Sequence, residues 1–230
     1  MSRERSESLL RAIERTVARY GSAPKGAKHY VAAKLRFDPV IDVISALGFH
    51  LGETVDAGAG RGQCGLCLAE LGLVSTLSGF DWDDAKVAIA NSAANGRATY
   101  AQDDLTAYRF ERPVDTVLLI DVLHYIAADD QNRLVGQAFT ALRPGGRLLI
   151  RDVDAAAGRS GWTRIAEKIG TVLRINRARV LEFRSAAEVR HVLEKLGAVV
   201  SVHAASDGPL TNVLLVAQKP STRSAGEGRP

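Results

Sequence analysis

The stretch that decides the fold is Val55-Asp-Ala-Gly-Ala-Gly-Arg-Gly62. It follows a short strand pattern at residues 53–57 and precedes a helical pattern at residues 62–71. Glycines 58, 60 and 62 let the backbone turn tightly and approach a ligand closely. The spacing is Gly-x-Gly-x-Gly rather than the Gly-x-Gly-x-x-Gly of dinucleotide-binding loops. Asp56 would repel a pyrophosphate but suits an ammonium group, so we expect a ligand that carries an amine and no phosphate.

Outward from this loop, strand and helix patterns alternate along the chain. Strands are predicted at residues 53–57, 73–80, 98–102, 114–120, 147–153, 198–205 and 210–219. Helices are predicted at residues 6–20, 28–47, 62–71, 83–95, 129–142 and 160–175, and from the capping box at Ser185 to Gly197. Such alternation implies a doubly wound α/β fold with a mostly parallel sheet. Ligands bind these sheets at the carboxyl ends of the strands.

Four consecutive predicted strands end in aspartate, and this set predicts the ligand site. After Asp56 come Asp81, then Asp103 with Asp104, and then Asp121. A carboxylate at Asp81 can accept hydrogen bonds from both hydroxyls of a ribose. Trp82 could lay its ring against a purine, and one of the Asp103–Asp104 pair could accept from an exocyclic amine. One such aspartate would indicate only a loop or a helix cap, but four beside a glycine loop favour a ligand site.

With these motifs in place, residues 53–219 resemble the class I S-adenosylmethionine-dependent methyltransferases. The resemblance rests on VDAGAGRG, GFDWDD, YAQDDL, DTVLLIDVLHYI and LRPGGRLLIRD, in that order. It implies a Rossmann-like, seven-stranded sheet with a reversed last strand, and S-adenosyl-L-methionine as cofactor. The loop would hold the amino-acid end of the cofactor, Asp81 the ribose, and Trp82 and Asp104 the adenine. The family usually has glycine where Asp103 stands, so the choice between Asp103 and Asp104 stays open. The cofactor residues expected on this basis are Asp56, Gly58, Gly60, Gly62, Asp81, Trp82, Asp103, Asp104, Leu105 and Asp121.

Methyl transfer from a sulfonium mainly requires alignment of the reactants and exclusion of water. A general base is needed only where the acceptor arrives protonated. His124 follows the fourth strand and is the candidate catalytic base; the alternative is that it shapes the pocket, as Tyr125 would. Asp152 ends the fifth strand, where it either orients an acceptor or caps the next segment. Cys64 and Cys67 have a Cys-x-x-Cys spacing without a second pair, so we expect them to pack and expect no metal site.

The acceptor side is expected to come from two cap segments. We predict an N-terminal helical cap at 1–50, a cofactor-binding domain at 51–219 and a disordered tail at 220–230. The insert after the fifth strand carries an apolar stripe, which either packs on the sheet or lines an acceptor tunnel. This stripe consists of Trp162, Ile165, Ile169, Val172 and Leu173. The segment Tyr30-Val-Ala-Ala-Lys-Leu-Arg-Phe-Asp-Pro39 also resembles one in methyltransferases of bacterial aryl-polyene and related lipid pathways.

Charge is concentrated in both cap segments. Residues 1–36 hold nine Lys or Arg against three Glu, and residues 159–184 hold seven against two. These charges are either solvated helix faces or a field that attracts an acidic partner. The second interpretation suits a small apolar acceptor with an acidic group, or an acceptor on an acidic acyl carrier protein. No basic run or aromatic cluster indicates nucleic acid as a partner.

Length and composition limit the class of protein and its expected location. The 230 residues carry a net charge of +4 and are 46% hydrophobic, which fits one globular α/β domain. No apolar run reaches about 18 residues, and the N-terminal residues lack the pattern of a secretory signal. Two cysteines without such a signal indicate a reducing compartment, so the expected location is the cytoplasm.

The favoured function is S-adenosylmethionine-dependent methylation of a small molecule, most simply on oxygen. Methylation of RNA or protein is the alternative, but Asp121-Val-Leu-His124 is not the Asn-Pro-Pro-Tyr type of tetrapeptide that planar nitrogen acceptors would predict. A non-catalytic partner that keeps the fold would be indicated by degenerate glycines, and all three are present. A nucleotide-linked oxidoreductase is disfavoured by Asp56. The sequence leaves the acceptor and the oligomeric state open.

Overall fold

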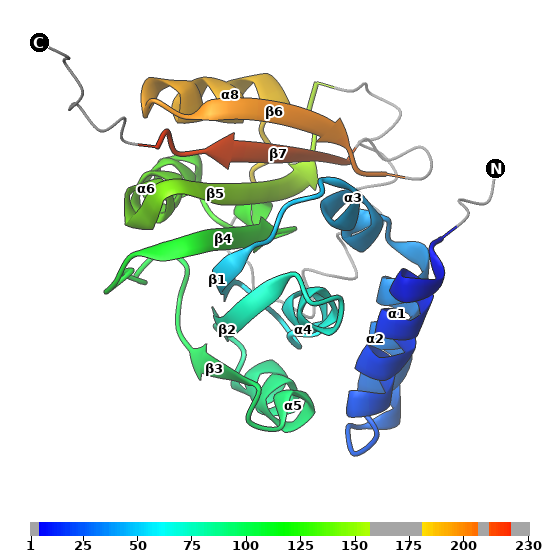
Figure 1. Ribbon diagram of the computed structural model, residues 1–230. Coiled ribbons are helices and arrows are strands. Elements are labelled where there is room, and N and C mark those ends of the chain that lie inside the picture. Colours follow the sequence, from blue (N-terminus) through cyan, green and yellow to red (C-terminus); the bar gives the residue numbers. More distant parts are fainter. Residues whose placement is uncertain (1–4, 157–180, 207–211, 222–230) are drawn as a thin grey trace, which may run out of the picture.

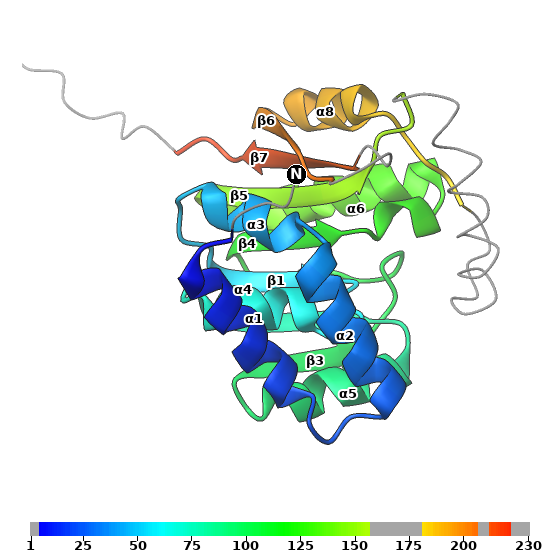
Figure 2. The same cartoon turned by 90° about the vertical axis from the view of Figure 1, so that its right-hand side faces the viewer.

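The computed structural model describes residues 5–156, 181–206 and 212–221, which form a seven-stranded sheet with helices on both faces (Figures 1 and 2). The strand order is β3-β2-β1-β4-β5-β7-β6. The strands are β1 (Gly52–Ala57), β2 (Val74–Asp81), β3 (Ala98–Gln102), β4 (Val114–Ile120), β5 (Leu142–Val153), β6 (Val199–Ala204) and β7 (Asn212–Gln218). β7 runs antiparallel to β5 and β6, whereas the other neighbours pair in parallel. The predicted Rossmann-like sheet with its reversed last strand is therefore confirmed.

The helices divide between the two faces of the sheet. On one face are α1 (Glu7–Arg19), α2 (Lys25–Phe37), α3 (Val40–Ala46), α4 (Gln63–Glu70) and α5 (Asp84–Ala94). On the other are the short 3₁₀ helix η1 (Leu123–Tyr125), α6 (Ala128–Ala141) and α8 (Ala186–Lys195). α8 begins with the predicted capping box between Ser185 and Glu188. None of the described helices is long and apolar enough to cross a membrane.

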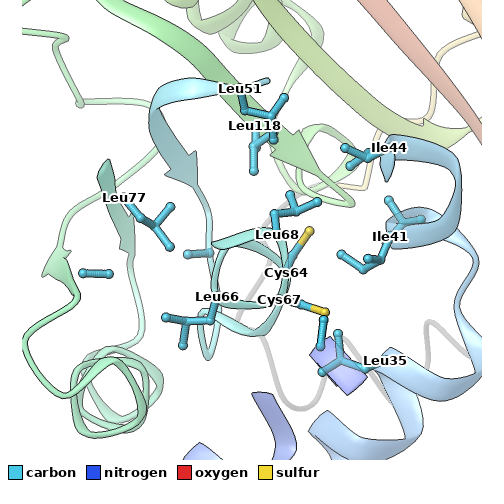
Figure 3. Close-up of a cluster of buried hydrophobic side chains, with 14 of the residues drawn as sticks. Leu35, Ile41, Ile44, Leu51, Cys64, Leu66, Cys67, Leu68, Leu77 and Leu118 are labelled. Atoms are coloured by element: carbon cyan, nitrogen blue, oxygen red, sulfur yellow. The ribbon is translucent and has the colours of Figure 1, made fainter. Parts of the chain in front are cut away.

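The central strand β4 is buried on both faces because its apolar residues are consecutive. Leu118 points into the cluster formed with α2, α3 and α4, while Val117 and Leu119 point into the cluster formed with α6 and α8. Figure 3 shows Leu118 beside Leu51, in the same cluster as Leu68, Cys64 and Cys67 of α4. Both cysteines are buried and free, which confirms that they pack in the core. No metal-ligand cluster occurs among the residues that the structure describes.

Two boundaries differ from the sequence prediction. α6 ends at Ala141 and β5 begins at Leu142, so Pro144-Gly-Gly146 lies inside the strand instead of ending the helix. The reason is that Leu142 already pairs with Val114, before a register shift that the glycines accommodate. The stretch predicted to be helical at 28–47, with Pro39 in a turn or at a helix start, is two helices: α2 begins earlier, at Lys25, and Pro39 is the N-cap residue of α3.

The cap and tail predictions are only partly covered by the described residues. Helices α1 and α2 lie side by side over one face of the sheet and pack against α4 (Figure 2). The division at residues 50 and 219 stays a prediction. The predicted insert at 160–175, with its apolar stripe, and nearly all of the predicted tail lie outside the described ranges.

Candidate active site

A cavity of about 1010 Å³ opens at the carboxyl ends of β1, β2 and β4, beneath α2 and α3. Eight of the residues that sequence analysis assigned to the cofactor line it. They are Asp56, Gly58, Gly60, Asp81, Trp82, Asp104, Leu105 and Asp121. Among the described residues, Gly62, Asp103 and His124 are not part of this lining. The predicted convergence of strand ends on one site is thus visible, whereas the individual ligand roles stay predictions.

The glycine loop is pinned to the neighbouring strand. The backbone N–H groups of Gly58 and Ala59 donate to the carbonyl of Phe80 at 2.8 and 2.9 Å. Gly58, Gly60 and Gly62 have φ values of +73°, +57° and +76°, which favour glycine. A Cβ on Gly62 would lie 2.8 Å from the Tyr100 ring, but a Cβ on Gly60 would meet no atom within 4 Å. Gly62 is therefore needed for packing, while Gly60 presents bare backbone to the cavity.

Asp56 is the most deeply buried acid of the cavity, with 2% of its surface exposed. Its Oδ2 accepts a hydrogen bond from the backbone N–H of Gly65 at 3.2 Å. Burial raises the pKa of Asp56 to about 7, the Gly65 N–H opposes this shift, and the charge of Asp81 adds to it. No cation of the described chain pairs with Asp56. Because an unpaired buried carboxylate is costly, this position suits the ammonium group of a ligand.

Asp81, Trp82 and Asp104 form the opposite part of the wall. Asp81 Oδ2 accepts from the Gly60 N–H at 2.8 Å, and Oδ1 accepts from the Asp83 N–H at 3.1 Å. Each oxygen keeps a further lone pair for a hydroxyl group. Trp82 is 38% exposed, and the Lys86 ammonium lies 5.5 Å from its ring centroid. Its ring is thus available to stack on a ligand.

The neighbouring aspartates are placed differently from each other. Asp104 lines the cavity, and its Oδ1 accepts from the backbone N–H and the hydroxyl of Thr106 at 2.7 and 2.6 Å. Asp103 Oδ1 instead accepts from the Asp104 N–H at 2.7 Å and so orders the loop. Of the two, Asp104 is the one positioned to reach a ligand.

Asp121 lines the cavity, but both of its oxygens are already bonded. Arg151 Nη1 donates to Oδ1 at 2.6 Å, and Lys34 Nζ donates to Oδ2 at 2.8 Å. Burial by itself raises the pKa of Asp121, yet the charges of Lys34 and Arg151 outweigh burial and lower it. Asp121 is therefore a carboxylate that already has two cationic partners.

His124 is paired with Asp152 beside the cavity. The two side chains approach to 2.7 Å between Nδ1 and Oδ1, and Asp152 Oδ2 also accepts from the His124 backbone N–H at 3.2 Å. The imidazole stacks on Phe183, with ring centroids 4.9 Å apart. If Nδ1 carries the proton that Asp152 accepts, Nε2 is left as a basic nitrogen. Asp152 thus contacts the candidate base, a pairing that sequence analysis missed.

Three further residues line the cavity wall and were not predicted as site residues: Tyr30, Lys34 and Arg61. The Arg61 guanidinium carbon lies 4.7 Å from the centroid of the Tyr30 ring, and its buried Nε has no hydrogen-bond partner. Arg61 has no ion pair within the described ranges, so it can take an anionic group of a ligand. The signal was present, because Arg61 belongs to the glycine loop and the other two to the segment at 30–39.

Comparison with known proteins identifies the same region. A family model described as a methyltransferase domain matches residues 54–146. No curated protein matches the chain. Among solved structures, an O-methyltransferase family protein from Burkholderia thailandensis aligns with a TM-score of 0.65 and 22% identity, over 84% of this chain and 58% of that one.

Two further structures share the fold. The pyocyanin biosynthetic protein PhzM aligns with a TM-score of 0.64 and 17% identity, over 88% of this chain and 61% of that one. Magnesium protoporphyrin IX methyltransferase from Synechocystis PCC 6803, with bound SAH, aligns with a TM-score of 0.61 and 19% identity, over 90% and 93% of the two chains. The chain spans about 60% of the length of the first two structures.

Proposed function

Because the chain carries a methyltransferase domain with the class I fold, whose cofactor is S-adenosylmethionine, we propose that the protein methylates a small, largely apolar acceptor, most simply on oxygen. The observation that carries the proposal is Asp56, a buried carboxylate on a large cavity without a cationic partner in the described chain. The methionyl ammonium of the cofactor supplies the missing charge.

The remaining cavity residues fit the other parts of the cofactor. Arg61 is the cation for its carboxylate, and Asp81 accepts hydrogen bonds from its ribose. Trp82 and Leu105 flank the adenine, and Asp104 accepts from the adenine amine. The glycine loop supplies backbone that approaches the ligand at Gly60 and packs tightly at Gly58 and Gly62. Asp103 acts through the Asp104 backbone, and Asp121 completes the wall. When bound, the cofactor supplies an electrophilic methyl group.

His124 is the general base of this proposal. It takes the proton of an acceptor hydroxyl at Nε2, and the Asp152 carboxylate stabilises the imidazolium that forms. The Asp152 contact also holds the ring in one orientation, and the Phe183 ring covers one of its faces. A base fits an acceptor that arrives protonated, such as a phenol, whereas a carboxylate acceptor would not need His124.

The acceptor class follows from the walls and the charge of the cap. Part of the cavity wall is apolar, with Leu35, Val40, Ile41, Ile120, Val122 and Ile126. The net positive charge of residues 1–36 favours an acceptor with an acidic group, or an acceptor on an acidic acyl carrier protein. Both cysteines are free, which fits the proposed cytoplasmic location.

Titration calorimetry tests the cofactor assignment. We expect S-adenosylmethionine and its demethylated product, S-adenosylhomocysteine (SAH), to bind with micromolar affinity, about −7 to −8 kcal/mol. Asp81→Ala should weaken this binding by about 1–3 kcal/mol, because the ribose loses a charged acceptor and the Gly60 N–H loses its partner. Binding of NAD in place of SAH would contradict the proposal.

A further inference from the structure

The segment from Tyr30 to Pro39 leads to a charge cluster beside the cavity, here termed the ion quartet. Its members are Lys34, Asp38, Asp121 and Arg151. Lys34 belongs to α2 and Asp38 follows it, while Asp121 follows β4 and Arg151 lies in β5. Two cations and two anions balance each other. The quartet therefore joins the cap to the middle of the sheet without adding net charge.

Asp121 is the centre of the ion quartet. It accepts from Arg151 Nη1 at 2.6 Å and from Lys34 Nζ at 2.8 Å. Asp38 forms a second ion pair with Lys34, and its Oδ2 lies 3.1 Å from Arg151 Nη1. Lys34 and Asp121 are 87 residues apart in the sequence, so this contact is made only by the folded chain.

The ion pairs lower the pKa of Asp121 and raise the pKa values of Lys34 and Arg151, so these three groups stay charged around neutral pH. Burial alone would lower the pKa of Lys34, but Asp121 and Asp38 outweigh burial and raise it. The side chain of Arg151 is only 4% exposed, whereas those of Lys34 and Asp121 are each 27% exposed at the cavity. Removing one partner of such a cluster leaves the other charge poorly solvated, so the contacts favour one position of α2.

The backbone at Asp121 is also held in an unusual conformation. Its φ of +59° lies in the left-handed region, which costs a non-glycine residue of order 1–3 kcal/mol. The Asp121 backbone N–H donates to the Arg151 carbonyl at 2.8 Å. Both this backbone hydrogen bond and the ion quartet therefore hold Asp121 in its conformation. Lys34 and Asp121 both line the cavity, which places the strained residue where α2 meets the ligand site.

We propose that Lys34 and Asp121 are positioning residues, which hold α2 in place as a wall of the cavity and thereby set how fast SAH leaves. The inference rests on the proposed function, because it concerns the product of that reaction. Cofactor and product pass the cavity wall, and wall movements limit turnover in many enzymes. Breaking the Lys34–Asp121 contact lets α2 move away, so release becomes faster.

The test measures SAH release in a Trp162→Phe background, where Trp82 is the remaining tryptophan. We expect Lys34→Met and Asp121→Asn each to speed release in stopped-flow displacement by about tenfold, the effect of about 1.4 kcal/mol. Lys34→Arg should restore slow release because it keeps the charge. Arg19→Met is the matched control, since Arg19 ties α1 to Glu70 away from the cavity lining.

A double variant distinguishes faster release from a loss of folding. Lys34→Met/Asp121→Asn removes one charge of each sign and keeps the Asp38–Arg151 pair, so it should fold and still release SAH quickly. Amide hydrogen exchange in the ligand-free protein should show faster exchange in α2 for these variants. Unchanged exchange and release would overturn the proposal. Faster exchange with unchanged release would also overturn it, because the quartet would then be a structural support only.

The outcome separates this inference from the proposed function. If the unmodified protein fails to bind SAH, the proposed function is wrong, and the role in product release falls with it. If SAH binds and leaves the variants as slowly as it leaves the control, only the role of the ion quartet is wrong.

Discussion

The proposed role of Asp56 links cofactor binding to pH. Its carboxyl group is buried and accepts one backbone hydrogen bond, from the N–H of Gly65. Burial is the main reason that its pKa is raised to about 7. An ammonium ligand stabilises the ionised form and so must displace the proton. The proposed role therefore predicts an affinity for the cofactor that depends on pH within the physiological range.

We expect SAH affinity to fall about tenfold for each pH unit below 7 and to level off between about pH 7.5 and 8.5. The reason is that only the ionised Asp56 binds the ammonium group. Calorimetry in two buffers of different ionisation enthalpy should detect proton release near pH 7. Asp56→Asn should bind weakly, without this pH dependence. Equal affinity at pH 5.5 and pH 8 in the unmodified protein would show that Asp56 does not bind the ammonium.

His124 and Asp152 give a second prediction, on turnover. With a protonated acceptor such as a phenol, His124→Ala should lower kcat by about 100-fold or more, because the base is lost. High pH should rescue the variant, since the acceptor then arrives ionised. Asp152→Asn should give a smaller loss, because Nε2 remains but loses its orienting partner. A small, pH-independent fall for His124→Ala would leave His124 as a residue that shapes the pocket.

The predicted acidic residues that line the cavity are those whose position follows from the strand pattern. Asp56, Asp81 and Asp104 lie at or near strand ends, and parallel strands bring such ends together. Arg61 was missed because an arginine in a loop is usually solvated, and only the folded chain shows its buried, unpartnered Nε. The contact between Asp121 and Lys34 could not be predicted, because no local pattern links residues so far apart.

At the level of elements, the hydrophobic periodicity and composition of the sequence predicted the positions of the strands well but misplaced the end of one helix. β3 and β4 have the predicted bounds, because β4 is a continuous apolar run and both are framed by turns. The α6–β5 junction was misplaced because Pro144-Gly-Gly146 resembles a helix stop, whereas pairing with β4 already begins at Leu142. Tertiary pairing thus overrides a local stop signal where a neighbouring strand is available.

The glycine loop allows a matched comparison of two substitutions. Gly62→Ala should destabilise the protein by about 2–5 kcal/mol, because a left-handed residue gains a Cβ that meets the buried Tyr100 ring at 2.8 Å. Gly60→Ala should cost only about 1–2 kcal/mol, since its Cβ meets open space. Gly60→Ala should nevertheless weaken SAH binding more than its stability loss suggests. Urea unfolding measures the loss of stability, and calorimetry measures the loss of SAH affinity. Equal destabilisation by the two substitutions would refute the packing role of Gly62.

For the whole molecule, pKa values that are shifted in opposite directions determine how the free energy of unfolding depends on pH. The pKa values of Glu70 and Asp121 are lowered in spite of burial, by Arg15 and Arg19 for Glu70 and by Lys34 and Arg151 for Asp121. Their contribution is present above the unfolded-state pKa of about 4 and is lost as pH falls through the folded-state value. The ion pairs that tie the cap to the sheet and to α4 therefore weaken in acid.

Asp56 acts in the opposite direction, because its pKa is raised to about 7. The folded chain then binds more protons than the unfolded chain between about pH 4 and 7, so the free energy of unfolding should fall as pH rises through this window. The size of the fall is on the order of 3–4 kcal/mol for one group shifted by about three units. Ligand-free protein should thus be most stable near pH 5, and SAH should restore stability at pH 8 by mass action.

Urea unfolding of the ligand-free protein at pH 5, 6, 7 and 8 measures this decline, and Asp56→Asn should remove most of it. The variant keeps an oxygen for the Gly65 N–H but has no charge to desolvate, so it should be more stable than the unmodified protein at pH 8 and similar to it at pH 5. Asp84→Asn, at an exposed position of α5, is the matched control and should keep the original slope. A stability that rises from pH 5 to pH 8 in the unmodified protein, or a slope that Asp56→Asn leaves intact, would mean that Asp56 is ionised in the folded state at no cost. The protein would then have no stored electrostatic free energy for the cofactor to relieve.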